Sequence, residues 1–277
     1  MKAGKRKIFF ISLLAVLLIL SAVFYFSPYS TALLKSKSNF IRSTGNKSVY
    51  YEPGAETYAA KIADYLPAAC ERVEQVHCLP FKEQFRVYVC GTQKSFNEFT
   101  ANTSGYPIRG AAMLGNVFIA PAAFSFMGAD TYRETLAHEL SHLHFSQRIG
   151  FFDRRKQPVW FSEGLADYAA GSGGEGTDEQ EVAGLILKGR HFNPDEEGEI
   201  FSTFRNSMNG LSGPVFHQQA KMFVAWMIEE DSLKFRSLIL ALQKGESFNK
   251  SFRAIMGPGV KEKWTQFVSV LRQKYTD

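Results

Sequence analysis

The pattern of apolar and polar residues separates a long uncharged stretch near the N-terminus from the rest of the chain. Residues 8–26 read IFFISLLAVLLILSAVFYF, with no charged side chain, and an apolar run of this length can cross a bilayer as a helix. Four basic residues precede it within positions 1–7, which favours a cytoplasmic N-terminus. We expect an uncleaved anchor. The alternative is a signal peptide cleaved after the Ser30-x-Ala32 pair, and either one exports the rest of the chain.

Beyond this stretch, the periodicity predicts helices and strands. Residues 35–49 are polar and basic and are typical of a tether. Apolar spacing over about 54–76 predicts a helix, which we expect Pro67 to kink or divide. Alternation predicts strands over 84–90 and 116–120.

Helical patterns dominate the remainder of the chain. A helix is predicted from Asp130 to about Gln147, and another from about Trp160. The glycine-rich stretch 171–178 is the predicted boundary between two lobes. Further helices are predicted over about 178–189, 214–229, 231–243, 246–255 and 259–273. Mixed elements followed by helices indicate an α+β fold.

Composition and charge narrow the classes of partner. The chain has 277 residues, of which 45% are hydrophobic, enough for one substantial core or two smaller lobes. Residues 1–49 contain eight basic and no acidic side chains, so 24 basic and 27 acidic side chains remain for residues 50–277. The predicted folded part is therefore slightly acidic, and nothing favours nucleic acid as a partner.

Three cysteines, Cys70, Cys78 and Cys90, lie close together in the sequence. In an exported protein one pair can be oxidised, with the pairing left open. The alternative is three reduced side chains that behave as small hydrophobic residues. No Cys-x-x-Cys spacing is present, which argues against a thiolate zinc site.

The stretch TLAHELSHLHFS, residues 135–146, carries the most specific chemistry. On a helix turning about 100° per residue, His138 and His142 share one face, with Glu139 beside them and the leucines opposite. Two histidines four apart can bind one zinc ion, which lowers the pKa of a bound water toward about 7. Glu139 can then take the proton of that water as it attacks a carbonyl. The alternative is an exposed polar helix face with no third ligand nearby.

A third ligand candidate follows 21 positions after His142. The stretch VWFSEGLADYAAG places Glu163 and Asp167 four apart on a second helix, so both carboxylates share a face. Glu163 can bind the metal while Asp167 accepts an N–H from a ligating histidine. Gly164 and Ala166 are small enough to allow close approach of the two helices.

Two sequence runs, HELSH at 138–142 and WFSEGLADY at 160–168, resemble those of the gluzincin metallopeptidases. These comprise thermolysin-like proteins and the peptidase-MA-like relatives of the aminopeptidases. The motifs cover about residues 135–170, and a weaker resemblance extends over about 50–275. The resemblance implies a zincin-like fold with an active-site helix and an edge strand that binds extended substrate, mapped here onto about 116–120.

The resemblance also implies roles for individual residues. It places one zinc ion on His138, His142 and Glu163, with Glu139 as the catalytic base and Asp167 supporting a ligating histidine.

Gluzincins further supply a Tyr or His from the helical lobe to stabilise the developing oxyanion. His217, 54 positions after Glu163, is the candidate here. The alternative is a surface histidine near a helix N-terminus, and Tyr168 and Tyr106 are weaker candidates. We interpret His144 as structural, because it falls about 200° from His142 on the helix.

The combined prediction is a zinc-dependent peptidase of α+β, zincin-like fold, anchored in the cell membrane by a single span with its catalytic domain outside the cytoplasm. Its partners are a peptide or protein substrate and the membrane. The alternatives are a non-catalytic or structural peptide-binding protein of the same fold, or a zinc hydrolase of a non-peptide amide. The predicted organisation is a basic N-terminus with an anchor or signal sequence (1–34), a tether (35–50), a zincin-like catalytic lobe (51–172) and a helical lobe (173–277).

Overall fold

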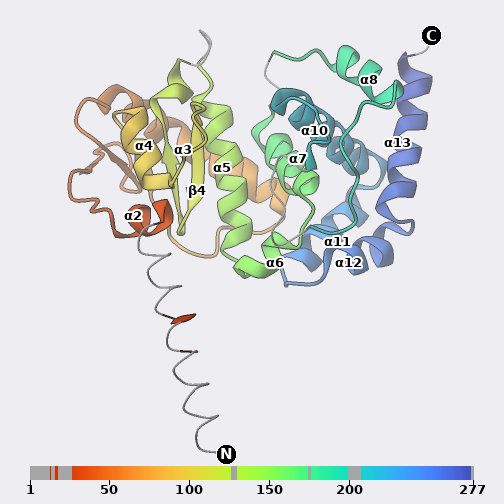
Figure 1. The fold of residues 1–277 in the computed structure, drawn as a ribbon, viewed down its shortest axis with the longest axis horizontal. Helices are drawn as coiled ribbons and strands as arrows, with labels where there is room; N and C mark the ends of the chain where they lie inside the picture. The colour runs from red at the N-terminus through yellow and green to blue at the C-terminus, as the bar shows by residue number, and fades with distance from the viewer. Residues whose placement is uncertain are drawn as a thin grey trace, which may run out of the picture.

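A computed structural model of the chain describes residues 27–125, 130–173, 176–198 and 207–275, together with Leu13, Val16 and Leu17. Helices predominate, and they enclose a small five-stranded sheet (Figure 1). The sheet and its covering helices make up one half of the view, and helices alone make up the other.

The predicted transmembrane segment, which was part of the predicted fold class, is corrected by the structure. A spanning helix needs about 20 consecutive apolar residues. Within the described part of the chain, no helix combines the length and apolar character needed to cross a bilayer. Most of the predicted span, residues 8–26, lies outside the described residues. The prediction of a single-pass membrane location is therefore unsupported as well.

The sheet has the strand order β1-β2-β3-β5-β4. The three inner strands run parallel, and the outer strands β1 and β4 are antiparallel to their neighbours. The strands are β1 (Ile41–Arg42), β2 (Val49–Tyr51), β3 (Val87–Val89), β4 (Gly110–Met113) and β5 (Asn116–Ile119). Strand β1 and the start of β2 fall within residues 35–50, the stretch predicted as a tether.

The predicted edge strand is wrong by one position in the sheet. Residues 116–119 form β5, which lies between β3 and β4, so β4 is the strand at the edge. The two strands pair from Met113 opposite Asn116, across a two-residue turn in which Leu114 and Gly115 both have positive φ. Such a turn matches the twist of the two strands in a hairpin, and it pairs β4 with the side of β5 that faces away from β3.

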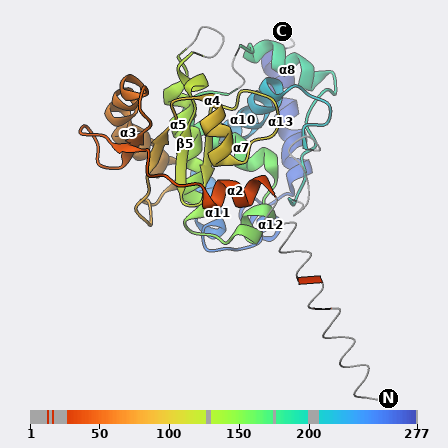
Figure 2. The ribbon, with the colours of Figure 1, turned by 60° about the vertical axis from the view of Figure 1, so that its left-hand side comes forward.

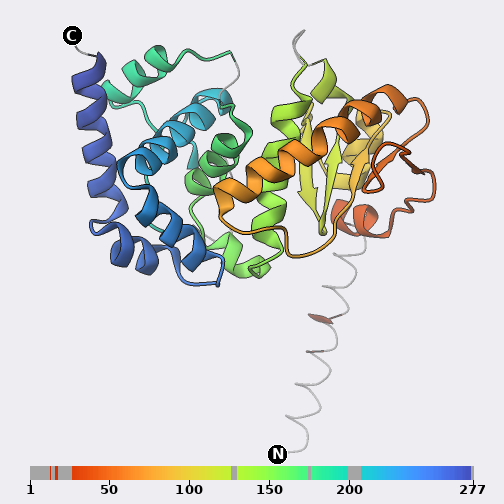
Figure 3. The same cartoon turned by 180° about the vertical axis from the view of Figure 1, so that it is seen from behind.

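The two faces of the sheet are covered by different helices. Val87, Val89, Val117 and Ile119 pack with α3 (Glu56–His77) and α5 (Tyr132–Ser146) in one buried cluster. The intervening side chains face α4 (Gln93–Thr100) on the other side, where α2 (Pro28–Leu34) packs against α4. Figure 3 shows α3 crossing one face, and Figure 2 shows α2 and α4 together. Helix α3 is a single helix that contains Pro67, so of the two predicted effects, a kink or a division, the division does not occur.

The helical half surrounds an aromatic core that includes Trp160, Phe161, Phe192 and Phe223. Its helices are α7 (Val159–Ala170), α8 (Glu179–Leu187), α10 (Gly213–Glu230), α11 (Ser232–Leu242), α12 (Phe248–Met256) and α13 (Val260–Tyr275). A short helix, α6 (Phe151–Arg155), connects α5 to α7, and a 3-10 turn, η1 (Pro121–Phe124), precedes α5.

Helix α7 lies between α5 and α10 and packs against both (Figure 1). Its Gly164 makes the contact with α10 possible, because a Cβ at this position would lie 2.5 Å from the carbonyl oxygen of Ala220. Helix α5 carries the two histidines and helix α7 carries the two carboxylates. The two helices are therefore held together between the sheet and the helical core.

Candidate metal centre

Helix α5 turns its leucines into the core and its titratable side chains toward α7. Leu136, Leu140 and Leu143 are fully buried, whereas the side chains of His138 and His142 each remain 17% exposed. The apolar side of the helix fixes its orientation, since rotating it would expose these leucines to water. The histidines are consequently held toward the neighbouring helix.

Three side-chain atoms from the two helices converge on one point. The Nε2 atoms of His138 and His142 are 3.0 Å apart. Glu163 Oε2 lies 3.2 Å from Nε2 of His138 and 3.4 Å from Nε2 of His142. These residues form the group in the described part of the chain that could hold a metal ion.

The spacing of these atoms fits zinc. Two ligand atoms bound to one tetrahedral zinc ion at about 2.0–2.1 Å lie about 3.3 Å from one another. The three observed separations are close to that value. Two imidazole nitrogens and one carboxylate oxygen are also the ligand types of a catalytic zinc site, which keeps its fourth position open.

Asp167 fixes the orientation of the first histidine. Its Oδ1 accepts a hydrogen bond of 2.9 Å from Nδ1 of His138, because a carboxylate can only accept. Because Nδ1 donates to Asp167, Nε2 is the ring nitrogen of His138 that faces the convergence point and is placed to bind a metal ion. The Nδ1 atom of His142 lies 3.5 Å from the Ser162 hydroxyl, on the side of the ring away from that point.

The charges of these groups stabilise one another. Burial disfavours the charged form of His138, but Asp167 and Glu163 outweigh it and raise the pKa of His138 well above its ordinary value. Burial also opposes ionisation of Glu163, yet His142 and His138 hold the pKa of its carboxyl well below the usual range. A metal ion would replace the proton that these groups share, since ligands bind zinc in their deprotonated forms.

The same Asp167 also contacts His217, on α10. Its Oδ2 accepts a hydrogen bond of 2.7 Å from Nδ1 of His217, and the rings of His138 and His217 have centroids 5.9 Å apart. The structure thus places His217 beside the candidate site rather than on the helix surface. Of the weaker candidates, Tyr168 packs against the helical core and Tyr106 is 67% exposed.

The side chain of Glu139, which belongs to α5, lies against the edge strand β4. A Cβ built on Gly110, the first residue of β4, would lie 2.7 Å from Cγ of Glu139 and 2.7 Å from Cγ2 of Thr135. Glycine therefore allows β4 to approach the glutamate. Sequence reasoning missed Gly110, and its available signal was the run of small residues GAA at positions 110–112, shortly before the hairpin turn.

His144 lies on the other side of α5, as predicted. It is fully buried, and its Nε2 donates to the carbonyl of Leu79 over 2.8 Å. Its ring packs against His77, with centroids 4.6 Å apart. Burial lowers the pKa of His144 to about 4, so it is a neutral structural residue.

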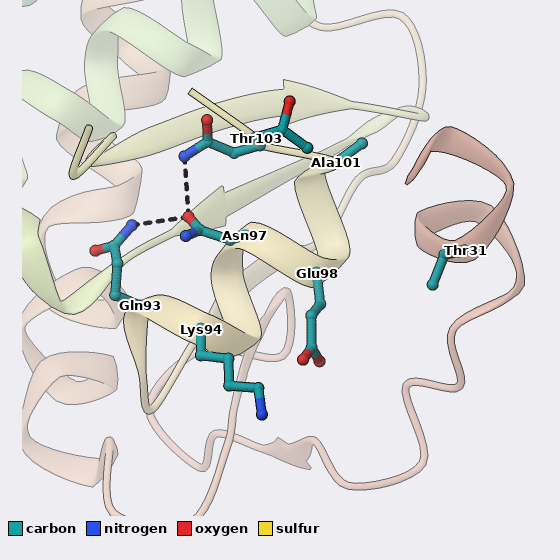
Figure 4. Close-up of a pocket in the computed structure, with 8 residues that line it drawn as sticks. Thr31, Gln93, Lys94, Asn97, Glu98, Ala101 and Thr103 are labelled. Atoms are coloured by element: carbon teal, nitrogen blue, oxygen red, sulfur yellow. Dashed lines mark hydrogen bonds between the residues drawn. The ribbon is translucent and has the colours of Figure 1, made fainter. Parts of the chain in front are cut away.

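A surface hollow of about 500 Å³ lies elsewhere, along α4 and close to α2 (Figure 4). Its lining includes Lys94, Asn97 and Glu98 and none of the three convergent residues. Because α4 and α5 cover opposite faces of the sheet, this hollow is separate from the candidate metal centre.

Comparison with known proteins shows a likeness of fold alone. No family model and no curated protein matches the chain. Among solved structures, the chain is similar to yeast LTA4 hydrolase in complex with bestatin, with a TM-score of 0.50 and 12% sequence identity. The match covers 85% of this chain but 39% of that one, so the chain spans about two fifths of the length of this relative.

Proposed function

We propose that the protein is a zinc-dependent peptidase that hydrolyses peptide bonds with Glu139 as the general base. The observation that carries this proposal is the convergence of the Nε2 atoms of His138 and His142 with Oε2 of Glu163, at separations of 3.0–3.4 Å. The likeness to a hydrolase structure supports the same class of reaction.

The residues divide the chemistry among them. A bound zinc ion would supply positive charge that polarises a substrate carbonyl and makes a water molecule more acidic. Glu139 neighbours the first ligand on α5 and takes the proton of the attacking water, which it then passes to the leaving amine. Asp167 keeps the ring of His138 in the orientation that leaves Nε2 free to bind.

His217 would stabilise the oxygen of the scissile carbonyl as it gains negative charge. Burial opposes the charged form of His217, but Asp167 outweighs it and raises the pKa of the imidazole above its ordinary value. With Nδ1 donating to Asp167, the charged ring has an Nε2–H to donate toward the reacting oxygen.

Strand β4 is the element suited to hold the substrate. It lies at the edge of the sheet, and its Gly110 lies against Glu139. An extended peptide can add to such an edge through main-chain hydrogen bonds. This arrangement would place a peptide bond beside the base without requiring a particular side chain.

The proposal is tested by metal analysis and peptide hydrolysis on the same preparation of the full chain. We expect about one zinc per chain, cleavage of members of a peptide library, and loss of cleavage upon removal of zinc with a chelator. A zinc-loaded protein that cleaves no peptide would contradict the peptidase assignment, and a chain that binds no zinc would contradict the metal centre.

A further inference from the structure

The last turn of α7 carries the carboxylate that holds two histidines. Asp167 is buried and lies in the final turn of this helix, which ends at Ala170. Its side chain accepts hydrogen bonds from His138 of α5 and His217 of α10. The last four carbonyl groups of a helix have no partner within the helix. The groups that bond to these carbonyls therefore determine how firmly the turn, and Asp167 with it, is held in place.

An arginine from another helix bonds to two of these carbonyls. Helix α3 crosses the sheet and reaches α7 (Figure 3). Its Arg72 donates from Nε to the carbonyl oxygen of Ala169 and from Nη2 to that of Tyr168, the latter over 3.2 Å. The carbonyl of Asp167 accepts from the backbone N–H of Ser172 at 3.2 Å. A cation at a helix C-terminus is also attracted by the helix dipole, so Arg72 stabilises the turn that contains Asp167.

Two glycines allow the segment after α7 to pack closely on both sides. Gly171 ends the helix with φ +72°, and a Cβ at this position would lie 3.2 Å from Nη2 of Arg72. A Cβ on Gly173 would lie 2.6 Å from Cδ of Lys221, which belongs to α10. This short segment is therefore in contact with α3 on one side and with α10 on the other.

Helix α7 is shared between the two halves of the molecule. Ala169 packs in the same buried cluster as the sheet and α3, whereas Trp160 and Leu165 pack in the helical core. His138 comes from the half that contains the sheet and His217 from the helical half, and Asp167 is their common partner. A small rotation of the last turn of α7 would therefore change both hydrogen bonds at once.

We propose that Arg72 is a positioning residue, which holds the last turn of α7 against α3 and thereby aligns Asp167 with both His138 and His217. It acts through the main-chain carbonyls of α7 and not on the substrate. The expected effect on turnover rests on the proposed peptidase function. The effect on the two hydrogen bonds of Asp167 can be measured without any reaction.

Proton NMR of the metal-free full chain measures these two hydrogen bonds. The protons on Nδ1 of His138 and His217 are each held by one oxygen of Asp167, and they report its orientation. We expect Arg72→Gln to shift both resonances and to speed their exchange with water. Arg72→Lys keeps the charge but not the planar set of donors, so it should show a smaller change.

The rate of hydrolysis gives the second measurement, at saturating zinc. Arg72→Gln should lower kcat about tenfold and leave KM nearly unchanged, because a small misplacement caused by a distant substitution can cost up to about 100-fold. Arg72→Lys should retain part of the lost rate.

Gln243→Ala is the matched control. Gln243, which follows α11, also donates a side-chain hydrogen bond to the carbonyl of the last residue of a helix, that of His77 on α3. Its loss should lower thermal stability but leave kcat and the two resonances unchanged. Thermal unfolding is measured for every variant.

Three results would overturn the inference. These are unchanged resonances in Arg72→Gln, equal changes in Arg72→Gln and Gln243→Ala, and shifted resonances with normal turnover. The first of them, in a protein that still cleaves peptides, would refute this inference alone. Shifted resonances in Arg72→Gln, when the unmodified zinc-loaded chain cleaves no peptide, would support the positioning role and refute the proposed peptidase function alone.

Discussion

Asp167 and His217 are joined by a hydrogen bond of 2.7 Å between Oδ2 and Nδ1, although they are 50 residues apart in the chain. The other oxygen of the same carboxylate holds His138 at 2.9 Å. One side chain on α7 therefore orients both a proposed metal ligand on α5 and a proposed catalytic residue on α10.

This shared carboxylate predicts different effects for two substitutions. Asp167→Asn should lower zinc affinity about 10–100-fold and also lower kcat, because it disturbs both histidines. His217→Phe should leave zinc affinity unchanged and lower kcat about 10²–10³-fold. Zinc titration and initial rates distinguish them. Loss of zinc affinity in His217→Phe would show that His217 supports the metal rather than the reaction.

Glu139→Gln tests the base. The amide keeps the size of the side chain but cannot accept the proton, so kcat should fall about 10²–10⁴-fold at unchanged zinc content. Glu181→Gln, an exposed change on α8, is the control. Undiminished turnover by a fully zinc-loaded Glu139→Gln protein would refute the assigned role.

Gly110→Ala should disturb the contact between β4 and α5. The new methyl group would lie 2.7 Å from atoms of both Glu139 and Thr135, and such overpacking costs about 1–3 kcal/mol in the free energy of unfolding. We expect kcat to fall as well, because Glu139 is displaced.

Two further variants control this prediction. Gly184→Ala, on α8, places its Cβ within 4 Å of nothing and should be neutral or stabilising. Adding Thr135→Ser to Gly110→Ala removes one of the two clashes and should restore part of the stability but not the activity. A Gly110→Ala protein with native stability and turnover would show that β4 need not lie so close.

The buried pair His77 and His144 predicts a loss of stability in acid. Burial is the main cause that lowers the pKa of His77 well below its ordinary value, and it lowers that of His144 to about 4. Unfolded histidine binds its proton near pH 6.5. Below that pH the unfolded state binds more protons, so stability is fully present above about 6.5 and decreases as pH falls toward 4.

Urea unfolding of the metal-free protein across this pH range measures the effect. His77→Gln removes one such group, so the decrease in its free energy of unfolding should be smaller by up to about 1.4 kcal/mol per pH unit. Parallel pH curves for the variant and the unmodified protein would contradict this account.

Local patterns in the sequence predicted much of the helical structure around the site. The helical period of α5 placed His138 and His142 on one face and the leucines opposite. The period of α7 placed Glu163 and Asp167 on one face in the same way, because helix geometry alone relates residues four apart. Most later helices were predicted for the same reason. Strand β4 was missed because GAAM contains no β-branched residue, and its turn uses Leu114 at positive φ instead of Asn or Asp.

The sequence patterns could not predict contacts between residues that lie far apart in the chain. The bond between Asp167 and His217 and the contact of Gly110 with Glu139 depend on how helices and strands pack, which no local spacing encodes. For the same reason, the sequence predicted β5 as the edge strand, whereas β4 lies at the edge. The long apolar run near the N-terminus predicted a spanning helix from composition alone, and no such helix is found among the described residues.

The central claim is that His138, His142 and Glu163 bind one zinc ion, and zinc K-edge X-ray absorption of the full chain tests it most directly. We predict two imidazole nitrogens and a carboxylate oxygen at about 2.0–2.2 Å, with zinc occupancy and thermal stability both reduced in Glu163→Ala. Full zinc occupancy with unchanged coordination in Glu163→Ala, or a zinc ion without imidazole ligands, would contradict the account.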